Sequence, residues 1–127
     1  MKLRTINAPD APLPAGGYAQ AVEITGVART LYVSGQIPVA LDGVVPEGFA
    51  DQARLVWRNI EAQLRAAGMG LDDLVKVTVF LSDRRHALDN RAVRQEVLGD
   101  RKVAMTVIIA GIFDEAWLLE IEAIACA

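Results

Sequence analysis

The fold of this chain is decided by its last strand, Leu118-Leu119-Glu120-Ile121-Glu122-Ala123-Ile124-Ala125, read together with the segment Ser34-Gly35-Gln36-Ile37-Pro38. Side chains of a strand alternate between its two faces, so Glu120 and Glu122 share one face and Leu119 and Ile121 the other. Two carboxylates on one face of an otherwise apolar strand are costly unless something binds or solvates them. The pair therefore marks either a ligand site or a solvent-filled interface.

Length and composition predict a single domain, residues 1–127, that associates with itself. The chain has 127 residues, 53% of them hydrophobic, and a mean hydropathy of +0.28, which is more apolar than a typical small soluble domain. A buried subunit interface accounts for this excess. The net charge of −3 and the lack of a dense basic run predict no nucleic-acid partner.

The distribution of apolar residues predicts a cytoplasmic protein with no membrane partner. The longest uncharged runs, Thr30–Leu41 and Val103–Phe113, fall far short of the roughly 20 residues that a spanning helix needs. The N-terminal residues lack the apolar core of a signal peptide. One cysteine, Cys126, cannot form an internal disulfide and is typical of a reducing compartment.

Scarce histidine and cysteine remove several classes of metal-site and nucleophile chemistry. One His and one Cys cannot build a Cys/His zinc site within one chain. His86 follows Arg84 and Arg85 in the predicted first turn of a helix, which favours a solvent-exposed imidazole. Gly68 is better explained as a helix C-cap than as part of a phosphate-binding loop. We therefore expect neither ATP nor NAD chemistry.

Hydrophobic periodicity predicts an α+β domain with a mixed sheet and two helices on one face. The expected helices are residues 49–67 and 84–98, and the expected strands are 18–24, 30–36, 74–81, 102–110 and 117–125. The first two strands are expected to form a hairpin through Thr25-Gly26, after an irregular segment that ends at Gly17. Because strands 74–81 and 103–109 are apolar at nearly every position, the face without helices must also be buried, most simply by self-association.

Motifs in register resemble the Rid (RidA/YjgF) family over essentially the whole chain. They are Gly17-Tyr18-Ala19-Gln20-Ala21, Ser34-Gly35-Gln36-Ile37-Pro38, Asn59 with Ala66-Ala67-Gly68, Val75 to Leu81, the single residue Asn90, Ala110-Gly111-Ile112, and Glu120 to Ala125. The resemblance implies a chorismate-mutase-like fold and a homotrimer whose sheets line a central barrel, with three clefts between subunits. It also implies hydrolysis of small reactive imines and enamines to keto acids and ammonia, without metal or organic cofactor.

The resemblance also implies the site residues, which are Tyr18, Ser34, Gly35, Asn90 and Glu120. Glu120 would orient a water molecule and move a proton, and Tyr18 would close over the substrate or donate a hydrogen bond. The alternatives without a catalytic role are that the Glu120 carboxylate is solvated in the trimer channel and that Tyr18 packs at an interface. Glu122 is the structural partner of Glu120 in this interpretation.

The chain departs from the family at the arginine that holds the substrate carboxylate. The alignment places that arginine at Ala104, or at Met105 if one residue is skipped, and neither is basic. Lys102, Arg101 or Arg91 could supply a displaced cation, although each is also explained as a surface charge. Met105 could instead line a more apolar cleft, or simply pack in the core.

Three functions therefore remain open from the sequence. The chain is an imine or enamine deaminase, a non-catalytic trimer that binds a small organic metabolite, or a chaperone-like oligomer without a pocket ligand.

Overall fold

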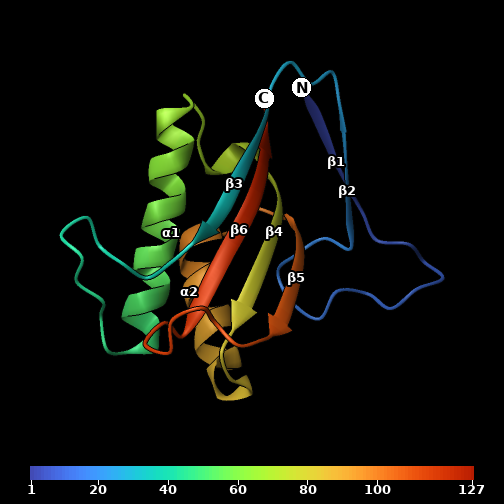
Figure 1. Ribbon diagram of the computed structural model, residues 1–127. Coiled ribbons are helices and arrows are strands. Elements are labelled where there is room, and N and C mark those ends of the chain that lie inside the picture. The colour runs from blue at the N-terminus through green and yellow to red at the C-terminus, as the bar shows by residue number, and fades with distance from the viewer.

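The sheet at the centre of the molecule has four strands and carries both helices on one of its faces. A computed structural model describes residues 1–127 (Figure 1). Its elements are β1 (Lys2–Ile6), β2 (Ala21–Thr25), β3 (Thr30–Gln36), α1 (Phe49–Ala66), β4 (Leu74–Leu81), α2 (Ala87–Leu98), β5 (Ala104–Ile109) and β6 (Leu119–Cys126), with single 3-10 turns at Leu71–Asp73 and Arg84–His86.

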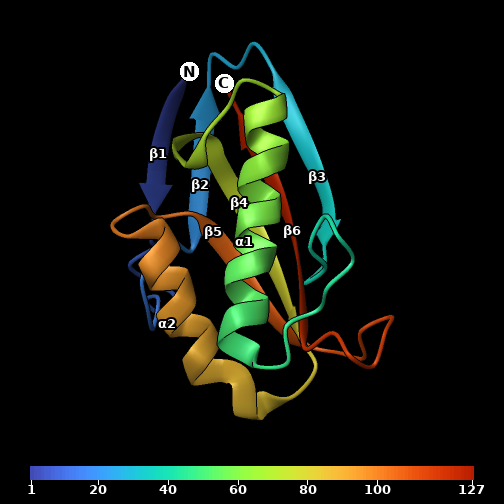
Figure 2. The same ribbon diagram turned by 90° about the vertical axis from the view of Figure 1, so that its left-hand side faces the viewer.

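The strand order is β3-β6-β4-β5, which places β3 and β5 at opposite edges of the sheet. β6 runs antiparallel to both of its neighbours, whereas β4 and β5 are parallel. Helices α1 and α2 lie side by side in front of the strands in Figure 2. The predicted α+β fold, with a mixed sheet and two helices on one face, is confirmed.

The core lies between these helices and the sheet, as the periodicity of both layers dictates. Residues of α1 at helical spacing, such as Trp57, Ile60 and Leu64, are at most 1% exposed. They meet the alternate residues of the central strands, including Val77 and Ile121, which are fully buried. Alternation along β6 places Glu120 and Glu122 on the other face, as the sequence predicts.

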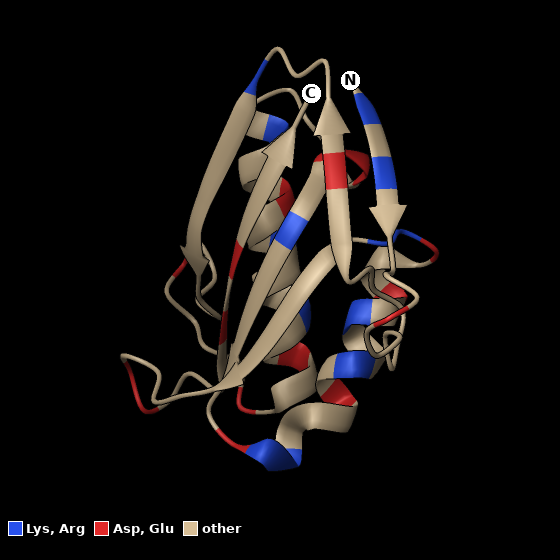
Figure 3. Cartoon of the chain, turned by 90° about the vertical axis from the view of Figure 1, so that its right-hand side faces the viewer, with Lys and Arg blue, Asp and Glu red and all other residues tan.

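The face of the sheet without helices stays open in the single chain (Figure 3). It carries apolar side chains such as Tyr32 and Ile108, which are 76% and 43% exposed. Lys76 crosses this face and donates a hydrogen bond from Nζ to Thr106 Oγ1 over 2.9 Å. Neither helix has the length and apolar character that crossing a membrane requires.

The predicted hairpin between the first two strands is wrong. β2 pairs with β1 in a separate two-stranded ribbon, and β3 pairs only with β6. The backbone N–H groups of Ala28 and Arg29 both donate to the carbonyl of Ala127, which fastens the chain to the end of β6 just before β3 begins. The ribbon stands apart from β3, on the β5 side of the sheet (Figure 3).

The expected irregular segment before Gly17 also contains a strand that the sequence pattern conceals. β1 is short and almost wholly exposed, so it has no apolar alternation to reveal it. Its pairing depends on β2, where the guanidinium of Arg4 meets the carboxylate of Glu23 with Nε 3.2 Å from Oε1. Ala19 N–H donates to Val103 O over 2.9 Å, which holds the ribbon against the start of β5.

The prediction of an exposed His86 is wrong as well, because the imidazole is only 8% exposed. It stacks on Phe49, the first residue of α1, with ring centroids 4.6 Å apart and planes inclined by 8°. Burial is the main cause that lowers the pKa of His86 below its ordinary 6.5, and the positive charge of Arg85 lowers it further, whereas Asp83 and Asp89 act in the opposite direction.

We expect stability to fall as the pH drops below about 6.5, because the unfolded chain then binds a proton at His86 that the folded chain resists. The loss ends once the pH is below the folded-state pKa. The urea midpoint of the wild type should therefore decrease between pH 8 and pH 5.5. His86→Phe keeps the stack on Phe49 and should decrease less. Parallel pH curves for the two proteins would contradict this assignment.

Gln52 of α1 ties together two loops that flank the sheet. Its Nε2 donates to Pro46 O over 2.7 Å and to Ala116 O over 2.9 Å, and its Oε1 accepts from Leu118 N–H over 2.8 Å. The side chain is 1% exposed, so water cannot replace these partners. It therefore positions the start of β6 against α1.

Gln52→Leu should destabilise the fold by about 2 to 4 kcal/mol, because it removes three hydrogen bonds made by one buried side chain. Urea unfolding measures this change. Gln63→Leu is the matched control on the same helix, since Gln63 makes a single 3.4 Å contact with Gln36. Equal midpoints for the two variants would show that Gln52 has no such role.

Candidate functional site

Glu120 and Gly35 are brought together where the pairing of β3 with β6 is irregular. The register shifts between Val33 and Gln36, and Gly35 lies within this irregularity. A methyl group added at Gly35 would lie 2.7 Å from Cδ of Glu120. The carboxylate therefore lies directly over the Gly35 backbone, and only glycine leaves room for it.

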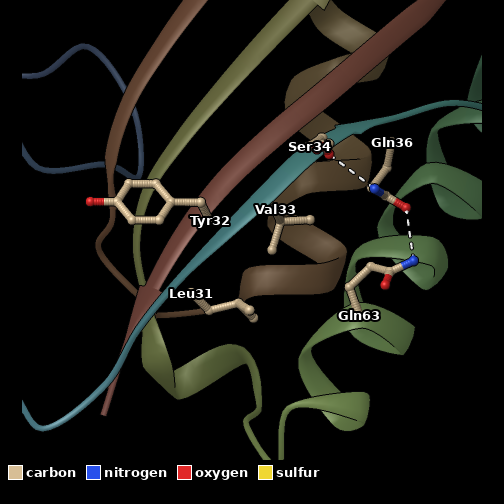
Figure 4. Close-up of a pocket in the computed structure, with 6 residues that line it drawn as sticks. All are labelled: Leu31, Tyr32, Val33, Ser34, Gln36 and Gln63. Carbon is tan, nitrogen blue, oxygen red and sulfur yellow. Dashed lines mark hydrogen bonds between the residues drawn. The ribbon is translucent and has the colours of Figure 1, made fainter.

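Ser34 immediately precedes Gly35 in the edge strand β3 and so lies beside this pair. It contributes to a pocket of about 260 Å³ whose lining residues are Leu31, Tyr32, Val33, Ser34, Gln36 and Gln63. In Figure 4, Leu31 and Val33 point toward the helices while Tyr32 points away from them. Gln36 Nε2 donates to Ser34 O over 2.9 Å, which holds this part of the chain in place. Gly35 itself lines a larger, adjoining hollow of about 620 Å³.

A second group of predicted site residues meets at the other edge of the sheet. Tyr18 and Asn90 line a pocket of about 200 Å³ together with Ala15, Ala87, Arg91, Arg94 and Val107. Asn90, Arg91 and Arg94 come from one side of α2, since residues three and four apart share a helix face. Tyr18 arrives from the segment that precedes β2. The pocket thus combines two cations with an amide and a phenol.

Arg94 is the functional candidate that sequence reasoning missed. Its side chain is 6% exposed, Nη1 lies 3.3 Å from Sδ of Met105, and the buried Nη2 has no hydrogen-bond partner. Burial is the main cause that lowers its pKa, with a further contribution from the charge of Arg91. The signal that could have found Arg94 is its helical spacing from Asn90 and Arg91.

Ala104 and Met105, the two expected anchor positions, face opposite sides of the sheet. Met105 pairs with the fully buried Val77 and therefore faces the helices, where it meets Arg94. Ala104 pairs with Lys76 and lies on the open face. Met105 thus adjoins Arg94 on the helix side, whereas Ala104 adjoins Lys76 on the open face.

The three cations considered from the sequence separate into two places. Arg101 is held by Asp72, with Nε 2.7 Å from Oδ1, and Lys102 is an exposed neighbour of this ion pair. Neither lines the pocket that contains Tyr18 and Asn90. Arg91 does line that pocket. Of the three candidates, Arg91 is therefore the one that lines the pocket with Tyr18 and Asn90, whereas Lys102 places its Nζ beside Gly17, 3.7 Å from where a Cβ there would lie.

One chain does not bring the two groups of site residues together. Ser34 and Gly35 lie on the edge strand β3 and Glu120 on its neighbour β6, whereas Tyr18, Asn90 and Arg94 line a pocket beside β5, with β4 between β6 and β5. Two strand spacings alone amount to about 10 Å. We call the first group the acid half and the second group the cation half of the candidate site.

Comparison with known proteins gives consistent matches along the chain. The family described as Endoribonuclease L-PSP matches residues 8–127. A RutC family protein of Pyrococcus horikoshii is 37% identical over 118 residues, which cover 91% of each chain. A RutC family protein of Aquifex aeolicus is 31% identical over 121 residues, which cover 94% of each chain.

Solved structures agree with these matches. The Rid family protein YyfB from Yersinia pestis superposes with a TM-score of 0.85 at 26% identity, over 100% of both chains. TdcF of Escherichia coli, crystallised with bound serine, superposes with a TM-score of 0.74 at 31% identity, over 98% of both chains. Because the family match spans nearly the whole sequence, and relatives more than 30% identical cover over nine-tenths of it, the chain belongs to the Rid (RidA/YjgF) family, described as endoribonuclease L-PSP.

Proposed function

We propose that this protein hydrolyses reactive imines of small organic acids, in clefts where the acid half of one copy faces the cation half of the next. The observation that carries this proposal is the division of the site between two edges of one sheet. A carboxylate at one edge and an uncompensated guanidinium at the other are complementary parts of one ligand site. A second copy is the simplest means of joining them.

A cyclic arrangement follows from where the halves lie. Contact between the β3 edge of one copy and the β5 edge of the next is head-to-tail, and such contacts close into rings when the rotation permits. The open face, with exposed Tyr32 and Ile108, would then line the inside of the ring. We propose a homotrimer, with a native mass three times that of the 13.7 kDa chain.

The reaction needs a base, a water molecule and a place for the substrate. In the proposed step the carboxylate of Glu120 takes a proton from water as the oxygen attacks the imine carbon. The C=N double bond becomes a C–N single bond in a carbinolamine, and the same proton passes to nitrogen. Glu120 then takes the hydroxyl proton of the carbinolamine and passes it to nitrogen as the C=O bond forms and the C–N bond breaks, giving a keto acid and ammonia. Tyr18 and Asn90 would hydrogen-bond the substrate from the opposite half.

Names and titles of relatives are consistent with this chemistry. The name of the E. coli protein TdcF, 38% identical over 81 residues, includes the words reactive intermediate deaminase. RNA cleavage, which the family description names, is the less suitable activity for this chain. Its net charge of −3 opposes binding to a phosphate backbone.

The test is direct hydrolysis of imines generated in situ by an amino-acid oxidase in the presence of semicarbazide. We expect added protein to reduce the semicarbazone that forms, in proportion to its concentration, because hydrolysis competes with trapping. Denatured protein at equal concentration is the control. Semicarbazone yields that do not change with native protein, for imines of both small and aromatic amino acids, would contradict a deaminase and favour a binding protein.

A further inference from the structure

The cation half contains a positive charge that nothing in the chain neutralises. Arg94 is only 6% exposed, and its Nη2 atom has no hydrogen-bond partner. The charged neighbour that acts on it is Arg91, which is also positive. The Gly16 backbone covers both side chains, since a Cβ there would lie 3.4 Å from Arg94 Nη2 and 3.8 Å from Arg91 Nε.

A buried guanidinium in this state is unfavourable unless an anion completes it. Burial without a carboxylate also lowers the pKa of Arg94, which is the expected consequence of a missing counter-charge. The methionine sulfur that contacts Nη1 is a weak acceptor and carries no charge. The fold therefore places a buried guanidinium nitrogen, without a counter-charge from this chain, at the wall of a pocket.

We propose that Arg94, assisted by Arg91, binds the carboxylate of a small organic acid in the pocket lined by Tyr18 and Asn90. A guanidinium presents donors in a planar fork that matches a carboxylate. The lining residues Ala15, Ala87 and Val107 supply an apolar wall for the rest of the acid. The volume of about 200 Å³ that one chain contributes suits the carboxylate end of a small molecule.

The carboxylate-binding proposal rests on the proposed function only for the identity of the acid, which would be the imine or the keto acid of the hydrolysis. Binding of the carboxylate can be measured without any reaction. The probe is 2-oxobutanoate, titrated calorimetrically into the full-length protein, with 2-oxobutanamide as the uncharged analogue and inorganic phosphate as the competing anion. We expect the acid to bind and both the amide and phosphate to bind at least about tenfold more weakly.

Arg94→Gln should raise the Kd for 2-oxobutanoate by about 10- to 100-fold, because the substitution removes charge-assisted hydrogen bonds. Arg91→Gln should have a smaller effect, since Arg91 is exposed. Arg58→Gln, an exposed arginine of α1, is the control and should bind as the wild type does. An unchanged Kd in Arg94→Gln would overturn the proposal, and so would phosphate binding tighter than the acid.

Thermal unfolding gives a second readout that a purely structural role would not produce. Arg94→Met removes an unneutralised buried charge, so the ligand-free variant should melt at a higher temperature than the wild type. It should also lose the increase in Tm that 2-oxobutanoate gives the wild type. A lower Tm combined with a smaller native mass would instead identify Arg94 as an ion-pair partner at a subunit interface.

The two proposals fail in different ways. If 2-oxobutanoate binds through Arg94 but no imine is hydrolysed, the anion site stands and the proposed reaction is wrong. If imines are hydrolysed and Arg94→Gln changes neither Kd nor KM, the reaction stands and Arg94 is not the anchor.

Discussion

Glu120→Gln is expected to reduce kcat/KM for imine hydrolysis by about 10²- to 10⁴-fold, the range that general acid–base catalysis contributes. Glutamine keeps the size of the side chain and its place over Gly35 but cannot accept a proton from water. The KM should change little, because the substrate is held mainly by the cation half. The measurement is the semicarbazone assay with one imine at several concentrations.

The matched control for this variant is Glu122→Gln. Glu122 lies one strand period from Glu120 on the same open face of β6, but it is exposed, and the atoms nearest to a Cβ at Gly35 all belong to Glu120. We expect its activity to stay near that of the wild type. Equal losses of activity in the two variants would indicate a general effect of charge on the open face. Full activity in Glu120→Gln would exclude Glu120 as the base.

Gly35→Ala is expected to reduce activity about as far as Glu120→Gln does, with little loss of stability. The added methyl group would lie 2.7 Å from Cδ and 3.0 Å from Cγ of Glu120, closer than real side chains approach. These atoms belong to the outer part of a flexible side chain, so the carboxylate moves while the sheet remains. A shift of the catalytic carboxylate by 1 Å can cost about 10²-fold in rate.

Two controls separate this displacement from damage to the fold. Gly111→Ala adds a methyl group where nothing lies within 4 Å, so it should be as active as the wild type. The double variant Gly35→Ala/Glu120→Gln should be no less active than Glu120→Gln alone, because both changes act through one carboxylate. A further multiplicative loss in the double variant would show that Gly35 acts independently of Glu120.

Much of the fold could be predicted because its central elements carry strong periodicity. Apolar residues alternate in β4 and β6 and form a stripe along α1. These patterns predicted which elements are strands or helices and which side of each faces the core. The N-terminal ribbon could not be predicted. β1 has almost no buried side chain, and the partner of β2 depends on where the 26–29 connection runs rather than on local pattern.

The candidate site could be predicted only in part, for a related reason. Glu120 is recognisable in the sequence as a carboxylate within an otherwise apolar strand. The pairing of β3 with β6 then places its side chain over Gly35. Arg94 looks like an ordinary helix charge in the sequence. Its burial depends on Met105 from β5 and on the Gly16 segment, which only the tertiary fold brings together.

The central claim, that each site is shared between two copies, is tested by mixing two inactive variants. Glu120→Gln retains the cation half and Arg94→Gln retains the acid half, so a hybrid ring contains clefts in which both halves are intact. An equal mixture with random exchange in a cyclic oligomer should recover about one quarter of wild-type activity. Native mass spectrometry confirms that hybrids have formed. Hybrids that form and show no activity above that of the separate variants would contradict the shared site.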